Sequence, residues 1–242
     1  MFFLKFWQHR RRLAGMLALV QGAVLCASLA APAQASENVP YVALTFDDGP
    51  SGRYTRRLLD GLYDRGVHAT FLLCGYRLKD YPELAQRMVD EGHEIGLHGY
   101  SHKAMKDMSR RDIAAELTDT QALLPPDCQP VFVRPPGGLA SDSVRQVAQA
   151  RRLALLHWSV DPKDWDCRDP GPVKERVLNN IQDGDIVLLH DLSASSVTAA
   201  LEIVDTLLER GYQIVTVSQL AKVRNKSLTP GKTYSSFPPP NR

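Results

Sequence analysis

Several absences in the 242-residue chain narrow what it could be. It contains no Gly-x-Ser-x-Gly sequence, which argues against an esterase that carries its serine nucleophile on a strand-to-helix elbow. It has no internal repeat at a solenoid period, and nothing in it calls for a second fold, so one α/β domain with its own core is expected. Its formal net charge is only +2, and no basic patch favours a nucleic-acid partner.

Cysteine is also scarce. Beyond the N-terminal segment only Cys74, Cys128 and Cys167 are present, and an odd number leaves at least one thiol unpaired. Cys128 and Cys167 lie in loop-like surroundings and are the candidate disulfide if the chain is exported; whether it forms is left open. Cys74 lies within an apolar run and is expected to be a small buried apolar residue.

Residues 1–35 are organised like a signal peptide. Basic residues begin the segment, an apolar run follows, and Ala33 and Ala35 fit the small-x-small cleavage rule. Cleavage would remove four of the 29 basic residues and none of the 27 acidic ones, leaving a formal net charge of −2. We therefore expect a secreted or extracytoplasmic protein of the cell wall or periplasm. The alternative is a membrane anchor formed by an uncleaved leader, because the apolar run approaches the roughly 20 residues that span a bilayer.

After the leader, short apolar runs alternate with amphipathic stretches. The apolar runs predict strands at 41–46, 69–74, 93–98, 131–133, 153–158, 185–190 and 212–217. Helical spacing and capping residues predict helices at Tyr54–Asp64, Pro82–Glu91, Ser109–Leu123, Ser141–Ala150, Val173–Asn180 and Ser195–Arg210. Such an alternation predicts a parallel sheet buried on both faces, and both a barrel and an open doubly wound sheet satisfy it.

The predicted domain organisation has three parts. A signal peptide at 1–35 precedes a single domain at 36–221. Residues 222–242 are rich in serine, proline and charge, and are expected to form a disordered tail.

Polar residues follow five of the seven predicted strands. The carboxyl ends of parallel strands meet at one edge of a sheet, where functional groups gather. In chain order these residues are Asp47, Asp48, His98, His102, Arg134, Asp161, Asp164, Trp165, His190 and Asp191. Each group alone could be an ordinary polar turn, since Asp, Gly and Pro are common turn residues. Their recurrence at successive strand ends favours a functional site.

Two histidines and a carboxylate within this set are suited to binding a metal. Two neutral imidazoles and one carboxylate leave a fourth position open, as in catalytic zinc sites. The three residues between His98 and His102 let both rings face one ion, across a helical turn or around a loop, and Gly99 favours the loop. A second carboxylate could then act as base and a histidine across the pocket as acid.

Asp47 and Asp48 pose a geometric problem. A regular strand would send these adjacent side chains to opposite faces. We expect the Gly-Pro turn that follows them to bend the backbone so that both carboxylates reach one pocket.

Five segments spread over Tyr41 to about Ala221 resemble the motifs of the polysaccharide deacetylases, carbohydrate esterase family 4, with its NodB homology domain. They are TFDDGP, HGYSH, RPPGG, DPKDW and IVLLHD. The resemblance implies a distorted, incomplete (β/α)7-type barrel at 36–221. It also implies a metal-dependent hydrolase of amide bonds that removes N-acetyl groups from a glycan containing N-acetylglucosamine, releasing acetate.

The resemblance also bears on substrate, metal and partners. Peptidoglycan is the expected polymer; chitin oligosaccharides, poly-N-acetylglucosamine, acetylxylan or a catalytically inactive glycan-binding protein on the same fold are the alternatives. Zinc is the expected metal, with cobalt or another divalent ion as alternatives. The expected partner is the acetylated polysaccharide, with no nucleic acid and with membrane contact only through an uncleaved leader. A monomer is expected.

Carried over by position, the resemblance implies roles for nine residues. It makes Asp48, His98 and His102 the metal ligands; Asp47 the general base, tuned by Arg134; His190 the general acid, oriented by Asp164; and Gly137 and Trp165 parts of the substrate pocket.

Two positions depart from the family's motifs. Gly99 stands where a serine or threonine usually steadies the ligand loop. Gly137 stands where an aromatic residue is usual, although it keeps the backbone N–H that helps to hold an oxyanion.

Overall fold

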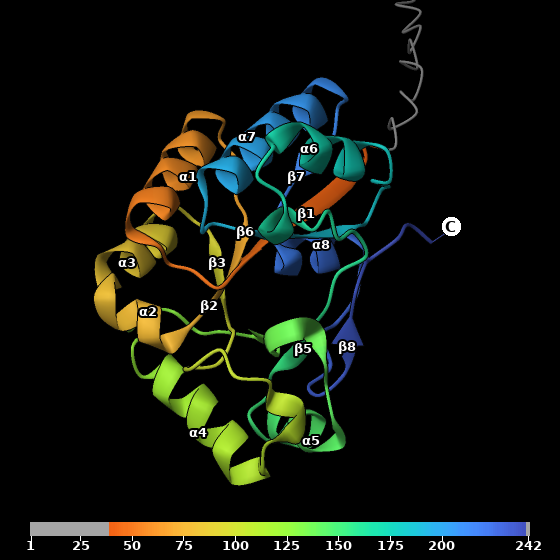
Figure 1. Cartoon of the computed structure of the whole chain (residues 1–242). Helices are drawn as coiled ribbons and strands as arrows, with labels where there is room; N and C mark the ends of the chain where they lie inside the picture. The colour runs from red at the N-terminus through yellow and green to blue at the C-terminus, as the bar shows by residue number, and fades with distance from the viewer. Residues whose placement is uncertain (1–38, 241–242) are drawn as a thin grey trace, which may run out of the picture. The chain divides into compact units, whose positions relative to one another are not determined.

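The seven predicted strands all form, and an eighth follows them in the computed structural model of the chain, which describes residues 39–240 (Figure 1). The predicted signal peptide lies outside the described residues. The strands are β1 (Tyr41–Asp47), β2 (Thr70–Leu73), β3 (Glu94–Leu97), β4 (Phe132–Val133), β5 (Ala154–Leu156), β6 (Ile186–His190), β7 (Gln213–Ile214) and β8 (Thr233–Tyr234).

The strands form one parallel sheet in the order β6-β1-β2-β3-β4-β5-β8, with β7 paired to β1. An isolated parallel bridge between Val160 and Val187 brings the segment after β5 back to β6. The sheet is therefore curled into an incomplete barrel, which confirms the fold that the family resemblance implied and excludes the open doubly wound sheet.

All six predicted helices are present, each within three residues of its predicted bounds. The helices are α1 (Gly52–Asp64), α2 (Gly75–Asp80), α3 (Pro82–Asp90), α4 (Arg110–Gln121), α5 (Asp142–Ala150), α6 (Pro170–Leu178), α7 (Ala194–Glu209) and α8 (Val217–Val223), with 3₁₀ turns at η1 (Met105–Asp107), η2 (Pro136–Gly138) and η3 (Asp164–Asp166). α2 and α8 were not predicted. None of the helices within residues 39–240 has the length and hydropathy of a membrane span.

The apolar side chains of β1 pack on both faces of the sheet, as a continuous apolar run requires. Val42, Leu44 and Phe46 join an outer cluster with residues of α1, α3, α6 and α7. Ala43 joins a second cluster inside the curled sheet, with Phe132 and with residues of α8. Alternation along β1 thus turns Asp47 to the same face as Ala43, toward the barrel interior.

The prediction of a disordered tail is wrong for residues 222–240. β8 pairs with β5, and the side chain of Phe237 is only 2% exposed within the inner cluster. The backbone N–H of Phe237 donates to the carbonyl of Gly184 at 2.7 Å. One buried aromatic ring and strand pairing outweigh the polar composition, because both depend on a partner far away in the sequence.

The cysteines carry no disulfide in the described part of the chain. Cys74, Cys128 and Cys167 are free thiols, so the candidate bond between Cys128 and Cys167 is not formed. The Sγ atom of Cys167 instead lies 3.2 Å from the carbonyl oxygen of Asp169, and burial raises the pKa of Cys128 to about 11. Cys74 is fully buried, as predicted.

Candidate active site

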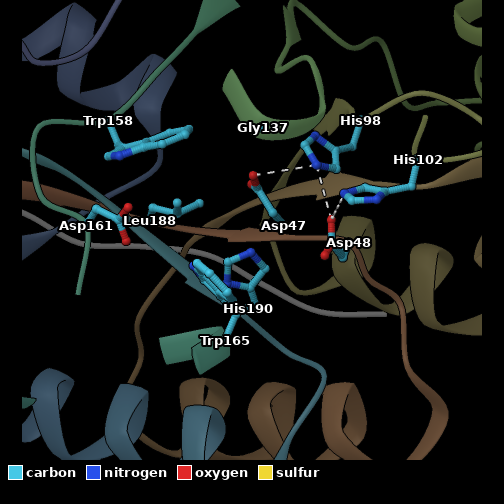
Figure 2. A pocket seen from close by; sticks show the side chains of 10 residues that line it. All are labelled: Asp47, Asp48, His98, His102, Gly137, Trp158, Asp161, Trp165, Leu188 and His190. Carbon is cyan, nitrogen blue, oxygen red and sulfur yellow. Dashed lines mark ion pairs between the residues drawn. The ribbon is translucent and has the colours of Figure 1, made fainter. Parts of the chain in front are cut away.

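A cavity of about 390 Å³ opens where the carboxyl ends of the strands meet (Figure 2). Its lining comprises Asp47, Asp48, His98, His102, Gly137, Trp158, Asp161, Trp165, Leu188 and His190. Seven of the nine residues singled out by the family resemblance are in this set. The other two, Arg134 and Asp164, lie behind the lining and contact Asp47 and His190, respectively.

Asp47 is held by a buried arginine. Nη1 of Arg134 donates to Oδ1 of Asp47 at 2.5 Å and to Oγ1 of Thr45 at 2.9 Å, and Nη2 donates to the carbonyl of His157 at 2.9 Å. Thr45 and Asp47 can share this partner because residues two apart on a strand face the same way. Arg134 is fully buried and Asp47 is 3% exposed, so the two charges compensate each other away from water.

Asp48 reaches the same cavity because the backbone turns at this residue. Its φ is +72°, in the left-handed region that asparagine and aspartate enter more readily than most residues. The expected bend therefore begins at Asp48 itself, one residue before the Gly-Pro pair. It removes the strand alternation that would have sent the carboxylates of Asp47 and Asp48 to opposite faces.

Asp48 and two imidazoles form a compact cluster of possible metal ligands. Oδ1 of Asp48 lies 2.9 Å from Nε2 of His102 and 3.1 Å from Nε2 of His98, and the ligand atoms all lie within 4.8 Å of one another. The two rings lie on one side of Asp48 in Figure 2. The predicted loop, rather than a helical turn, connects the two histidines.

The hydrogen-bonding chemistry of this cluster fits a divalent metal. Nδ1 of His98 lies 2.6 Å from the carbonyl oxygen of Arg134, which can only accept, so Nδ1 carries the proton and Nε2 presents a lone pair. Oδ1 of Asp48 faces Nε2 of both His98 and His102. A lone pair facing a carboxylate oxygen is stable only with a cation between them, and metal-binding histidines typically donate Nδ1–H to a backbone carbonyl or a carboxylate, as His98 does.

The same neighbours control the charge of Asp48. Burial by itself would raise the pKa of Asp48, but the neighbouring imidazoles of His102 and His98 lower it far below its usual range. Asp48 is therefore a carboxylate at neutral pH, as a metal ligand must be.

His190 ends the strand next to β1, directly beside Asp47 in the sheet register. Nδ1 of His190 lies 2.8 Å from Oδ1 of Asp164, and the backbone N–H of His190 donates to Oδ2 at 2.8 Å. Burial would lower the pKa of His190, but the hydrogen bond and charge of Asp164 prevail and raise it to about 9. His190 therefore holds its proton at neutral pH, and its Nε2 is available as a donor.

The apolar wall of the cavity includes residues that the sequence analysis missed. Trp158 stacks on the ring of His157 at 4.1 Å, and the guanidinium of Arg134 lies 5.5 Å from its ring. A side chain on Gly138 would meet Trp158 at 2.7 Å, so glycine is needed there. Leu188 also lines the wall. The available signal was an aromatic residue at the last position of the fifth apolar run.

Two predicted pocket residues lie at the open side of the cavity. Trp165 is 64% exposed. Gly137 has a φ of +70°, and no atom lies within 4 Å of the place where its side chain would begin. The missing aromatic residue therefore leaves open space at this rim.

Comparisons with known proteins point to one family. The sequence profile described as polysaccharide deacetylase matches residues 34–155. The chain is 39% identical over 191 residues to the peptidoglycan-N-acetylmuramic acid deacetylase PdaC of Bacillus subtilis, an alignment that covers 78% of this chain and 40% of that protein. It is 34% identical over 194 residues to a peptidoglycan-N-acetylglucosamine deacetylase of Bacillus cereus, covering 78% of this chain and 91% of the relative. Some of the related peptidoglycan deacetylases, including PdaC, are longer proteins, and the chain spans about two fifths of their length.

The fold is shared with solved structures as well. A family 4 acetyl xylan esterase from Clostridium thermocellum, solved in complex with a cobalt ion, superposes with a TM-score of 0.77 at 33% sequence identity. The match covers 82% of this chain and 99% of the esterase.

Proposed function

Because this chain belongs to the polysaccharide deacetylase family, we propose that it is a metal-dependent hydrolase that removes acetyl groups from a glycan and releases acetate. One observation carries the proposal. Oδ1 of Asp48 and the lone pair of His98 converge at 3.1 Å, in the same cavity as an Arg134-paired carboxylate and an Asp164-paired imidazole. Such a set combines a cation site with a base and an acid, which amide hydrolysis requires.

Asp48, His98 and His102 would hold the metal. Zinc is the ion we propose, because two histidines and one carboxylate form a common catalytic zinc set, although the cobalt in the related esterase shows that this fold accepts another ion. When bound, the ion supplies Lewis acidity for the amide carbonyl and lowers the pKa of water.

The remaining residues would move protons and orient the substrate. Asp47, whose Oδ1 accepts from Arg134 at 2.5 Å, takes the proton of the attacking water. His190, kept protonated by Asp164, delivers a proton to the departing amine. The backbone N–H of Gly137 would help to hold the oxyanion, and Trp165 would form part of the pocket for the sugar or its acetyl group.

We propose peptidoglycan as the polymer and its N-acetylglucosamine units as the substrate. The two curated relatives named above are described by different sugars of one polymer, so they support the polymer more strongly than the sugar. A peptidoglycan substrate also agrees with the export that the sequence of residues 1–35 predicts, since this polymer lies outside the cytoplasm.

An acetate-release screen tests these proposals. Protein loaded with zinc or cobalt is incubated with peptidoglycan, chitin oligosaccharides, poly-N-acetylglucosamine and acetylxylan, and mass spectrometry locates the lost acetyl groups. We expect release from peptidoglycan, and at least a hundredfold loss, by order of magnitude, in the Asp47→Asn variant, which keeps the shape but removes the base.

The outcomes separate the alternatives. Release from another polymer in the panel would replace peptidoglycan as the substrate. Stoichiometric metal and glycan binding without acetate release from any polymer would support the inactive glycan-binding protein and refute the proposed enzyme.

A further inference from the structure

The loop between the two histidine ligands is fixed from one side by α2. The backbone N–H groups of Gly75 and Tyr76 donate to the carbonyls of Gly99 and Tyr100, each at 3.0 Å. These bonds satisfy the carbonyl groups of the loop but leave its N–H groups without partners from α2. The backbone N–H groups of the loop between His98 and His102 therefore need acceptors from another element to fix its conformation.

Glu116, near the middle of α4, accepts from the other side of the loop. Its Oε2 atom accepts from the backbone N–H of Tyr100 at 2.6 Å and from that of Ser101 at 2.8 Å. Its Oε1 atom accepts from Oγ of Ser101 at 2.6 Å. One carboxylate therefore binds three donors from the two residues that immediately precede His102.

Gly99 is what allows the carboxylate to come so close. Its φ is +82°, and a side chain there would begin 2.6 Å from the methyl group of Met105 and 3.2 Å from Oε2 of Glu116. The serine or threonine that the family usually carries at this place would be strained by the backbone and would collide with Met105. The loop thus cannot be steadied from Gly99, and Glu116 supplies the hydrogen bonds instead.

Of the two histidine ligands, His102 is the less constrained by its own surroundings. Its side chain is 42% exposed whereas that of His98 is 2% exposed, and His98 is fixed by the carbonyl of Arg134. His102 also has a φ of +58°, which a non-glycine residue adopts only when its surroundings enforce it. The bonds from Glu116 act on the residue directly before it.

We propose that Glu116 is a positioning residue that holds the loop so that Nε2 of His102 stays beside Asp48. This inference rests on the proposed metal site formed by Asp48, His98 and His102. Glu116 contacts neither the proposed ion nor the cavity; it acts through Tyr100 and Ser101.

Metal affinity measures this role without any need for substrate. Apo-protein is titrated with Co²⁺, and the visible absorption spectrum reports both the dissociation constant and the ligand geometry. We expect Glu116→Ala to weaken Co²⁺ binding by about ten- to a hundredfold, the usual cost of losing a residue that orients a metal ligand, and to change the spectrum. Asp119→Asn, which removes an exposed carboxylate from the same helix, is the matched control and should bind like the wild type.

A conservative variant separates geometry from charge. In Glu116→Gln the amide oxygen can still accept from both backbone N–H groups, and the amide nitrogen can donate to Oγ of Ser101. We expect this variant to bind Co²⁺ within about threefold of the wild type. Equal losses in the glutamine and alanine variants would overturn the proposal, because charge rather than loop geometry would then matter.

Other results of the titration would also refute the proposal or its premise. If folded Glu116→Ala binds Co²⁺ with the wild-type constant and spectrum, Glu116 has no positioning role. If the alanine variant does not fold, Ser101→Ala takes its place, with an expected loss of about two- to tenfold, and unchanged binding refutes the inference. Wild-type protein that binds no Co²⁺ would overturn the proposed metal site itself, which is a different result from equal binding by wild type and variant.

Discussion

The Asp164→Asn substitution tests the proposed acid most directly. Asp164 is 1% exposed, and its two oxygens accept from Nδ1 and from the backbone N–H of His190. Asparagine has only one acceptor oxygen. Because the backbone N–H must keep an acceptor, the amide NH₂ of the variant would face Nδ1, which then becomes an acceptor. His190 would lose both its neighbouring charge and the tautomer that Asp164 imposes.

The magnitude follows from the pKa of His190. The difference between about 9 and the ordinary 6.5 corresponds to about 3 kcal/mol of preference for the protonated ring. If the variant returns the pKa to about 6.5, the protonated fraction of the wild type exceeds that of the variant by about fourfold at pH 7 and about thirtyfold at pH 8, but hardly at all at pH 6. Burial of His190 would enlarge these ratios by lowering the pKa further.

The assay is kcat/KM for acetate release from pH 6 to pH 9 at saturating metal. We expect the ratio of wild type to Asp164→Asn to rise with pH as calculated, and Asp166→Asn, which alters an exposed neighbouring acid, to leave the profile unchanged. A ratio that is large but independent of pH would refute the reasoning, since it would show that Asp164 does not act through the proton on His190.

Unfolding of the metal-free protein gives a second check that needs no substrate. A histidine with a raised native pKa stabilises the fold fully below its unfolded pKa of about 6.5, and this stabilisation is lost as the pH rises through about 9. Asp164→Asn should therefore lower the free energy of unfolding by about 3 kcal/mol at pH 6, with this contribution vanishing above pH 9. Urea denaturation at the two pH values measures the difference.

Three further predictions follow from burial and from the ligand set. Arg134→Met leaves the carboxylate of Asp47 buried without its partner, so urea denaturation should show a loss of about 3–5 kcal/mol; an unchanged midpoint would mean that the pair does not stabilise the fold. Phe237→Ala should lower the free energy of unfolding by about 3–5 kcal/mol, whereas a disordered tail would tolerate it at no cost. A chelator should abolish acetate release and added zinc should restore it, while Asp48→Asn should neither bind zinc nor recover, as elemental analysis can show.

Much of the scaffold could be predicted from local pattern. The runs that became β1 to β6 are apolar because both faces of the curled sheet are covered, and the helices between them carry recognisable start signals. Ser109 caps α4 by accepting from the N–H of Asp112, and Pro82 begins α3. Each of these features depends on residues within a few positions of one another.

Predictions from local composition were wrong where a contact with a distant residue determines the structure. The polar tail is ordered because Phe237 enters the inner cluster and β8 pairs with β5. The seventh run ends as a strand after Ile214 and continues as α8, whose start is fixed by a capping box between Thr216 and Gln219. The Thr-x-x-Gln capping signal is readable in the sequence, but the strand prediction at 212–217 rested on the apolar run alone.

The candidate site divides in the same way. Its types of side chain could be read from the sequence, because each follows a strand and parallel strands end at one edge. The residues that support or surround these side chains could not all be predicted. Glu116 lies on a helix face whose sequence resembles an ordinary solvent-exposed face, and Trp158 was predicted only as the last residue of a strand.

The sequence by itself determined the order of the elements, the edge at which the polar residues gather and the kinds of chemistry they offer. Only the tertiary structure decided that the segment after β5 returns to β6, that the turn into the cavity is made by Asp48 itself at a φ of +72°, and that Glu116 accepts from the backbone of the loop after Gly99. The physical reason is the separation along the sequence between the residues that interact. Strand and helix propensities act between near neighbours, whereas hydrogen bonds to a loop and the burial of an aromatic ring depend on residues that meet only in the folded chain.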